Sequence, residues 1–268
     1  QNFANAMGNM GEYEKGVAGM KRDLFSLINP DDTIVDLGAG LGPNIPYFPS
    51  SVSYTAVEPN QFMHSSLSEA GQHFTDPIQI LDDLRLVPTA SADVVISTLV
   101  FCSVKDQREV LTEVLRVLKN GGKFLFIEHV IEPSQGYPSP YNRGKFDWGR
   151  AVYSWAQSAS APLQMALADG CRGDRDTVAV ISEAFSDVFV KRFHVPDLWG
   201  GEDWWNFFPI GPQVAGVAIK RPLRDPGQMA EVQFKFCAAD YRLKQELKVK
   251  WEESARADEP SVRKIRCE

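Results

Sequence analysis

The sequence predicts an α/β fold with a mainly parallel sheet, and two observations carry this prediction. Between residues 33 and 131, short β-branched apolar segments alternate with segments whose apolar residues recur at helical spacing. This alternation is typical of parallel strands joined by helices that cover both faces of the sheet. In addition, a glycine-rich turn follows the first apolar segment, where folds of this class bind their ligands.

The elements expected up to residue 131 are assigned from apolar spacing. They are a helix over 12–28, strands over 33–38 and 53–60, a helix over 60–71, strands over 77–81 and 92–101, a helix over 105–122 and a strand over 123–131. The helix over 105–122 is expected to end in a C-cap at Asn120-Gly121-Gly122. The connection DDLRLVPTAS, over 82–91, is too short to predict a full helix.

The amino-acid composition of the chain changes beyond residue 131. Residues 132–210 hold all but one of the six tryptophans, and we expect them to contain an aromatic cap segment. Helices are expected over 143–168 and 175–184, and late strands over 186–195 and 213–220. Residues 222–268 form a charged C-terminal extension.

Composition and charge exclude several classes of function. The net charge of −7 over 268 residues argues against nucleic acid and against an anionic membrane surface as main partners. No run of about 18 apolar residues is present and the N-terminus does not resemble a signal peptide, so we expect no stable membrane insertion. The four cysteines form no C-x-x-C pair and no metal-ligand spacing with a histidine. We therefore expect reduced thiols, no metal site and a cytoplasmic protein.

The turn in IVDLGAGLGPN, residues 34–44, indicates a ligand that contacts backbone N–H groups. A phosphate loop would need Gly-Lys-Ser or Gly-Lys-Thr, which the chain lacks. A dinucleotide fingerprint would place its third glycine where Pro43 stands, although a Rossmann dehydrogenase is the alternative. Asp36 also argues against a dinucleotide, because its carboxylate would repel a pyrophosphate.

Three motifs together are more specific than the turn alone. VDLGAGLG is followed by VEPN at the end of the next strand and by VLKNGGKFLFIEH at the fifth. In these motifs the chain resembles the class I S-adenosylmethionine-dependent methyltransferases over residues 33–131. The resemblance implies a Rossmann-like seven-stranded sheet of order 3-2-1-4-5-7-6, with strand 7 antiparallel. Residues 1–221 would form the methyltransferase domain, with an N-terminal helix and the cap segment about 132–210.

The resemblance also implies roles for residues at the carboxyl ends of the strands. Asp36 would lie near the amino-acid end of S-adenosylmethionine, and Glu58 would bind the ribose hydroxyls. A solvated acid at a strand end is the alternative for both, and for Asp83. The expected cofactor-binding residues are Asp36, Gly38, Ala39, Gly40, Gly42, Glu58, Pro59, Asn60, Asp83, Leu84, Thr98 and Leu99.

A closer resemblance covers roughly residues 12–220. STLVFCSVKDQREVLTEVLRVLKNGG, IEHV, ALADGCRGDRDTVAVISEAFS and PIGPQVAGVAIK are similar to segments of the thiol S-methyltransferases of the methyltransferase-like seven group. This chain departs from that group in showing no N-terminal membrane helix and in carrying residues 222–268. The resemblance implies methylation of a small molecule, with a thiol as the favoured acceptor. N- or O-methylation of a specialised metabolite is the alternative, and an intact glycine turn argues against a non-catalytic subunit.

The acceptor is expected to bind beyond the fifth strand. His129 follows that strand and is a candidate base or substrate contact, with a structural hydrogen-bonding role as the alternative. Candidate substrate contacts are Cys102, Trp148, Trp155 and Trp205, for which ordinary core packing is the alternative. The C-terminal extension is a candidate homodimer contact.

Overall fold

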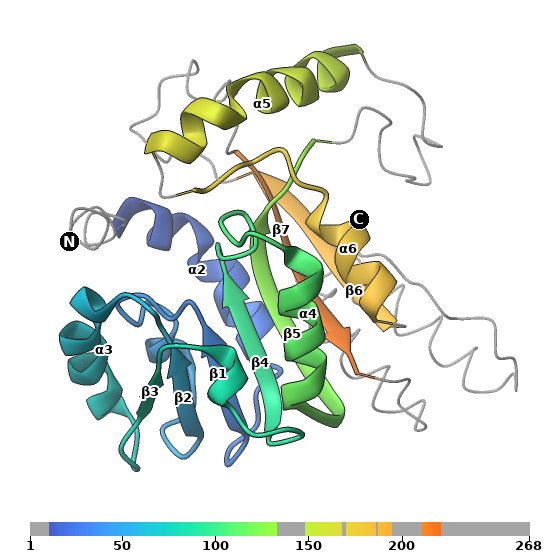
Figure 1. Cartoon of the computed structure of the whole chain (residues 1–268). Helices are drawn as coiled ribbons and strands as arrows, with labels where there is room; N and C mark the ends of the chain where they lie inside the picture. The colour runs from blue at the N-terminus through green and yellow to red at the C-terminus, as the bar shows by residue number, and fades with distance from the viewer. Residues whose placement is uncertain (1–10, 133–147, 168–169, 186, 195–210, 221–268) are drawn as a thin grey trace, which may run out of the picture.

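The computed structural model describes residues 11–132, 148–167, 170–185, 187–194 and 211–220 (Figure 1). Within these residues, seven strands form one sheet in the order β3-β2-β1-β4-β5-β7-β6. β7 runs antiparallel to β5 and β6, and the other neighbours are parallel. The strands are β1 (Thr33–Leu37), β2 (Ser53–Val57), β3 (Gln79–Leu81), β4 (Ala92–Thr98), β5 (Leu118–His129), β6 (Asp187–His194) and β7 (Pro212–Ile219). The expected fold class, strand order and antiparallel seventh strand are confirmed.

Helices cover both faces of the sheet (Figure 1). α2 (Gly11–Phe25) and α3 (His64–Ala70) pack on one face, where Leu24 and Leu67 share a core with Ile34. α4 (Gln107–Val117) and α6 (Thr177–Ala184) pack on the other, where Leu111 shares a core with Val35. Because side chains alternate along a strand, every second residue of the central strands points to the α2 face and the others to the α4 face.

The boundary between α4 and β5 differs from the prediction. Asp106 caps the start of α4 by accepting hydrogen bonds from two backbone N–H groups of its first turn. The helix ends at Val117, and Leu118 already has extended geometry and begins β5. The predicted C-cap at Asn120-Gly121-Gly122 is therefore wrong. The two glycines instead lie at an irregularity of the β4–β5 pairing, where a Cβ on Gly122 would lie 2.9 Å from the Lys119 carbonyl oxygen.

Among the described residues, one connection holds a short 3-10 turn and another a long helix. The third crossover holds only the 3-10 turn η4 (Leu84–Leu86), in agreement with the short connection expected there. α5 (Trp148–Leu167) lies beyond the carboxyl ends of β4 and β5 (Figure 1), whereas α6 covers the sheet and β6 forms its edge. Within the described residues, the segment 132–210 thus contributes α6 and β6 to the sheet layers as well as α5.

The described helices also bear on membrane contact. None of them has the length and apolar character needed to cross a bilayer. The C-terminal extension over 222–268 lies outside the described residues.

Candidate functional site

The carboxyl ends of β1, β2 and β4 meet at one edge of the sheet. Three backbone hydrogen bonds of 2.8 Å continue the parallel pairing one residue past these strands: Gly38 N to Val57 O, Glu58 N to Leu81 O, and Leu99 N to Ile127 O. The glycine turn, the segment after β2 and the loop after β4 thereby lie side by side. Open α/β sheets bind their ligands in a crevice of this kind.

The glycine turn is tightly packed at two of its three glycines. Gly38, Gly40 and Gly42 have φ angles of +64°, +58° and +83°, a region that favours glycine. A Cβ on Gly38 would clash with Val100, and one on Gly42 would lie 2.9 Å from the Ile45 side chain. A Cβ on Gly40 would meet nothing closer than 4.0 Å. Packing therefore explains Gly38 and Gly42, whereas at Gly40 a Cβ would make only ordinary van der Waals contacts and the positive φ alone favours glycine.

The residue between the first two glycines, Ala39, points inwards instead. It is almost fully buried and belongs to the core on the α2 face. Its side chain is therefore not available to a ligand.

Asp36 is fully buried and is held by two side-chain donors. The Tyr54 hydroxyl donates to Asp36 Oδ2 over 3.0 Å, and Asn44 Nδ2 donates to the same oxygen over 3.2 Å. Burial raises the pKa of Asp36 to about 6, although both hydrogen bonds oppose the shift. Asn44 Nδ2 also lies 3.2 Å from Thr98 Oγ1 at the end of β4.

The carbonyl oxygen of the Asn44 side chain completes this cluster. Asn44 Oδ1 is buried and accepts no hydrogen bond from the part of the chain that the structure describes. Buried acceptors without a donor are uncommon in folded proteins. An ammonium group beside the turn would satisfy this oxygen and would lie close to the Asp36 carboxylate. The cluster therefore fits the amino-acid end of S-adenosylmethionine.

Glu58 connects the glycine turn with the segment after β2. Its Oε2 accepts from Gly40 N and its Oε1 from Asn60 N, each over 2.8 Å. The carboxylate is therefore fixed by backbone on both sides. Each carboxylate oxygen has a second lone pair, so Glu58 retains the capacity to accept from two ligand hydroxyls.

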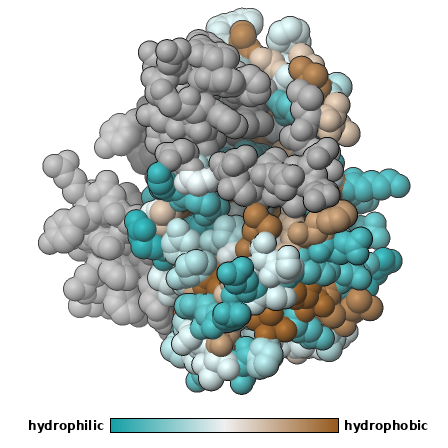
Figure 2. All heavy atoms as spheres, turned by 90° about the vertical axis from the view of Figure 1, so that its left-hand side faces the viewer, coloured by the Kyte–Doolittle hydropathy of each residue, from teal (hydrophilic) through white to brown (hydrophobic). Residues whose placement is uncertain are grey.

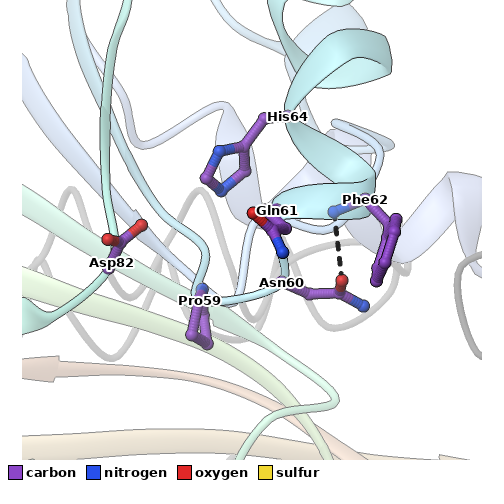
Figure 3. A pocket seen from close by; sticks show the side chains of 6 residues that line it. All are labelled: Pro59, Asn60, Gln61, Phe62, His64 and Asp82. Carbon is purple, nitrogen blue, oxygen red and sulfur yellow. Dashed lines mark hydrogen bonds between the residues drawn. The ribbon is translucent and has the colours of Figure 1, made fainter. Parts of the chain in front are cut away.

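A hollow of about 560 Å³ opens at Pro59, the residue that follows Glu58 in the sequence (Figure 3). Its lining consists of Pro59, Asn60, Gln61, Phe62, His64 and Asp82. The Asn60 side chain caps the 3-10 turn η2 (Gln61–Met63) by accepting from Phe62 N over 3.2 Å. The Phe62 side chain is 54% exposed, so its ring offers apolar surface beside the hollow. The volume lies in the range of ordinary ligand pockets.

Two of the expected cofactor contacts have other partners. Asp83 caps η4 by accepting from Arg85 N over 2.8 Å, and hydrogen bonds from the Arg85 side chain lower the pKa of Asp83. Leu84 is buried in the core on the α4 face. Asp82 lines the hollow together with Gln61, Phe62 and His64, and the sequence reasoning had not singled out the last three. Their position in the sequence could have identified them, because they follow β2, whose carboxyl end lies at the same edge of the sheet as that of β3.

The loop after β4 is fastened to a buried acid that the sequence did not single out. Glu128, near the end of β5, accepts from Ser97 Oγ over 2.6 Å, from Val100 N over 3.2 Å and from Phe101 N over 3.0 Å. Burial raises the pKa of Glu128 to about 8. Leu99 in this loop has φ +57°, which is uncommon for a residue other than glycine. Glu128 therefore fixes the backbone that turns Val100 towards the glycine turn.

His129 lies on the opposite face of β5 from Glu128. It is paired with Gln213 of β7 and is 7% exposed. Directly opposed residues of antiparallel strands share a face, which here is the face covered by α2. On this face the Tyr13 hydroxyl donates to Gln213 Oε1 over 3.0 Å, and Tyr13 packs against Leu99. The sequence did not predict that Tyr13 joins α2 to the start of β7, opposite the end of β5.

The candidate substrate contacts do not gather in one place among the described residues. Cys102 is buried, and its sulfur lies beside that of Cys171. Trp148 and Trp155 on α5 are 77% and 71% exposed, so neither belongs to a buried aromatic wall. Figure 2 shows further apolar side chains of α5 on the surface at the top of the view. Trp205 lies outside the described residues.

Known proteins share both the motifs and the arrangement of this chain. The family described as "Methyltransferase domain" matches residues 35–126, from β1 into β5. The thiol S-methyltransferase TMT1B of Rattus norvegicus is 33% identical over 220 residues, which cover 77% of this chain and 80% of that protein. The thiol S-methyltransferase TMT1A of Homo sapiens is 30% identical over 222 residues, covering 78% of this chain and 81% of that protein.

Solved structures share the fold at low identity. The YcgJ protein of Bacillus subtilis matches with a TM-score of 0.50 and 16% identity, covering 77% of this chain and 99% of that one. Geranyl diphosphate C-methyltransferase of Streptomyces coelicolor A3(2), solved with S-adenosyl-L-homocysteine, matches with a TM-score of 0.50 and 14% identity over 74% of this chain and 73% of that one. These likenesses establish the fold, and the relatives above establish the family. The chain is therefore an S-adenosylmethionine-dependent methyltransferase that belongs to the thiol S-methyltransferase family.

Proposed function

We propose that the protein methylates the thiol of a small molecule. One observation carries the proposal: named thiol S-methyltransferases are similar to this chain over 220 residues, far beyond the matched methyltransferase segment at 35–126. The likeness therefore extends outside the strands that hold the cofactor, into parts of the chain that are available for acceptor binding.

Each part of S-adenosylmethionine has a proposed partner at the sheet edge. The buried oxygen of Asn44 would accept from the ammonium group, and the backbone at Gly40 would lie along the methionine chain. Glu58 would accept from the ribose hydroxyls, and the hollow beyond Pro59 would take the adenine, with the exposed Phe62 ring beside it. When bound, the sulfonium supplies a methyl group that is activated for in-line displacement.

On the acceptor side, the chain has to align a sulfur atom and exclude water. A free thiol has a pKa of about 8.5, so part of it is ionised near neutral pH and no strong base is needed. We propose His129 as a substrate contact or proton acceptor at the end of β5. Tyr13 supports this end of the site, because its hydroxyl is bound to Gln213 opposite His129. Burial raises the pKa of Tyr13, so its hydroxyl stays protonated.

A product screen tests the acceptor class. The full chain is incubated with S-adenosylmethionine carrying an isotopically labelled methyl group and with matched small thiols, phenols and amines. Mass spectrometry is expected to find labelled thioethers only. Labelled products from phenols or amines with none from thiols would overturn the proposed acceptor.

Calorimetric titration with S-adenosylhomocysteine tests the cofactor contacts separately. Asn44→Ala and Glu58→Ala each remove a hydrogen bond to a charged or buried group, which is expected to weaken binding about tenfold or more. Glu69→Gln, on the exposed surface of α3, is the matched control and should bind like the wild type. Unchanged affinity in both site variants would contradict the assignment.

We also propose a cytoplasmic setting and a homodimer formed through residues 222–268, with no nucleic-acid partner. The support is the acidic charge, the absence of C-x-x-C pairs and the charged extension itself. Light scattering of the full chain at micromolar concentration tests the dimer, and a monomeric mass would contradict it.

A further inference from the structure

Two thiols from distant parts of the sequence lie side by side, one in the loop after β4 and the other in the segment after α5. Cys102 Sγ and Cys171 Sγ lie 3.0 Å apart, although 69 positions separate them in the chain. Both are free thiols; Cys102 is buried and Cys171 is half-buried. A disulfide bond holds its sulfur atoms about 2.05 Å apart, so a shift of about 1 Å would bring the two within bonding distance.

We propose that Cys102 and Cys171 form a reversible disulfide that ties the loop after β4 to the segment after α5 and slows cofactor exchange. Hydrogen peroxide is the oxidant considered. The Cys171 thiolate attacks one peroxide oxygen, which gives a sulfenic acid and releases hydroxide. The Cys102 sulfur then attacks the Cys171 sulfur, the S–O bond breaks and water leaves. In total, two thiols and one peroxide give one disulfide and two waters, and a dithiol reductant reverses the reaction.

The two cysteines differ in the way that this order of steps requires. The hydrogen bond between the two sulfurs lowers the pKa of Cys171. The same contact, together with burial, raises the pKa of Cys102. Cys171 is also the more accessible of the two. Reactive cysteines are partly exposed and carry a lowered pKa, whereas resolving cysteines lie beside them. Cys171 therefore suits the first attack and Cys102 the second.

Existing contacts already bring the two segments together without a covalent bond. Arg172 N donates to Cys102 O over 3.2 Å, and the Arg175 guanidinium donates to Phe101 O over 2.8 Å. These hydrogen bonds already hold the two backbone segments side by side, so disulfide formation does not require the segments to move towards each other. The hydrogen bonds can break and re-form, whereas a disulfide would keep the segments joined until it is reduced.

On its other side, the segment over 170–175 is fastened to α5. Gly170 N donates to Met165 O over 2.9 Å, and Gly173 N donates to Gln164 Oε1 over 3.1 Å. The buried Gln157 side chain donates to Gly173 O over 2.9 Å. A disulfide at Cys171 would therefore link the loop after β4 to α5, which lies beyond the carboxyl ends of the strands (Figure 1).

The loop after β4 borders the cofactor site, so its freedom to move affects exchange. Val100 of this loop packs against Gly38 of the glycine turn, and Glu128 anchors the same loop from β5. Exchange of a ligand from a closed crevice uses local opening of such loops. We expect a tether on this loop to slow release of S-adenosylhomocysteine about tenfold, within the range usual for coupling between two sites.

Peptide mapping of the full chain tests bond formation. Cys237→Ser and Cys267→Ser are introduced first, so that Cys102 and Cys171 are the remaining thiols. The folded protein is treated with hydrogen peroxide, blocked with iodoacetamide and digested with trypsin without reduction. Mass spectrometry is expected to find residues 86–105 linked to residues 151–172, and the link should disappear after dithiothreitol. The additional Cys171→Ser change should abolish it while circular dichroism stays unchanged.

The release rate of S-adenosylhomocysteine from these proteins tests the consequence. Stopped-flow displacement, without any thiol substrate present, is expected to be about tenfold slower after oxidation and to recover after reduction. The Cys171→Ser variant should release at the same rate before and after peroxide. Absence of the linked peptides, or an unchanged release rate in the linked protein, would overturn the proposal. Because no acceptor is used, this test is independent of the proposed acceptor class.

Discussion

Replacing Glu128 with glutamine tests whether the buried acid near the end of β5 is neutral in the folded protein. Burial raises the pKa of Glu128 to about 8, from 4.5 for an unperturbed glutamate. The Ser97 hydroxyl and two backbone N–H groups oppose this shift, because they favour the carboxylate. If burial dominates, Glu128 keeps its proton in the folded protein over a pH range in which the unfolded chain has released it.

The sign and size of the effect on stability follow from this difference. A carboxyl group whose pKa is raised on folding costs nothing below its unfolded pKa and destabilises the protein as pH rises towards its folded pKa. The loss is about 1.4 kcal/mol per pH unit between pH 4.5 and about pH 8. From pH 5 to pH 7 it amounts to about 3 kcal/mol. Glutamine has no titrating proton, so the Glu128→Gln variant lacks this slope.

Urea unfolding at a series of pH values measures the slope. The free energy of unfolding of Glu128→Gln minus that of the wild type should increase by about 3 kcal/mol from pH 5 to pH 7. The buried Asp36 titrates in both proteins, so its contribution cancels in the difference. Glu109→Gln, on the exposed surface of α4, should follow the wild type at every pH. A constant difference between Glu128→Gln and the wild type would refute the reasoning and would mean that Glu128 is an ordinary carboxylate held by its donors.

Four further substitutions test packing and hydrogen bonding in and around the site. Gly38→Ala should lower the free energy of unfolding by about 3 kcal/mol in urea, because a Cβ would overlap the Val100 side chain and φ +64° disfavours residues other than glycine. At Gly40 a Cβ would meet nothing closer than 4.0 Å, so Gly40→Ala should cost less and should weaken S-adenosylhomocysteine binding instead. Tyr54→Phe removes a donor to Asp36 and should raise the Asp36 pKa above about 6 in a carboxyl NMR titration, whereas a lower value would contradict the hydrogen bond. Gln157→Ala leaves three buried backbone groups without their partner and should lower the thermal midpoint, with a cost of about 2 kcal/mol or more.

The cofactor side of the fold could be predicted because its signals are local in sequence. VDLGAGLG and VEPN each combine the end of an apolar strand with the residues that directly follow it. In a parallel sheet those residues reach the same edge, so strand assignment alone brings Gly40 and Glu58 together. The alternation of apolar residues then fixes which face each strand residue occupies.

Contacts between distant segments could not be predicted in the same way. The hydrogen bond from Tyr13 to Gln213 spans 200 positions, and the contact of Cys102 with Cys171 spans 69. Neither pair has a spacing that a periodic pattern can report. The glycines at 121 and 122 show a second difficulty, because helix caps and strand irregularities both favour Gly, and only the pairing of β4 with β5 distinguishes them.

Residues 128 and 129 connect the end of β5 with the glycine turn and with the proposed acceptor site. They are adjacent in sequence, but the strand turns Glu128 towards the loop after β4 and His129 towards α2. Glu128 therefore acts on the glycine turn through Val100, whereas His129 shares its face with the Tyr13–Gln213 pair. The end of β5 thus supports the cofactor site from the α4 face and the proposed acceptor site from the α2 face. The Cys102–Cys171 pair joins the loop after β4, which Glu128 anchors, to the segment after α5. A disulfide there would therefore restrain the loop that packs against the glycine turn of the cofactor site.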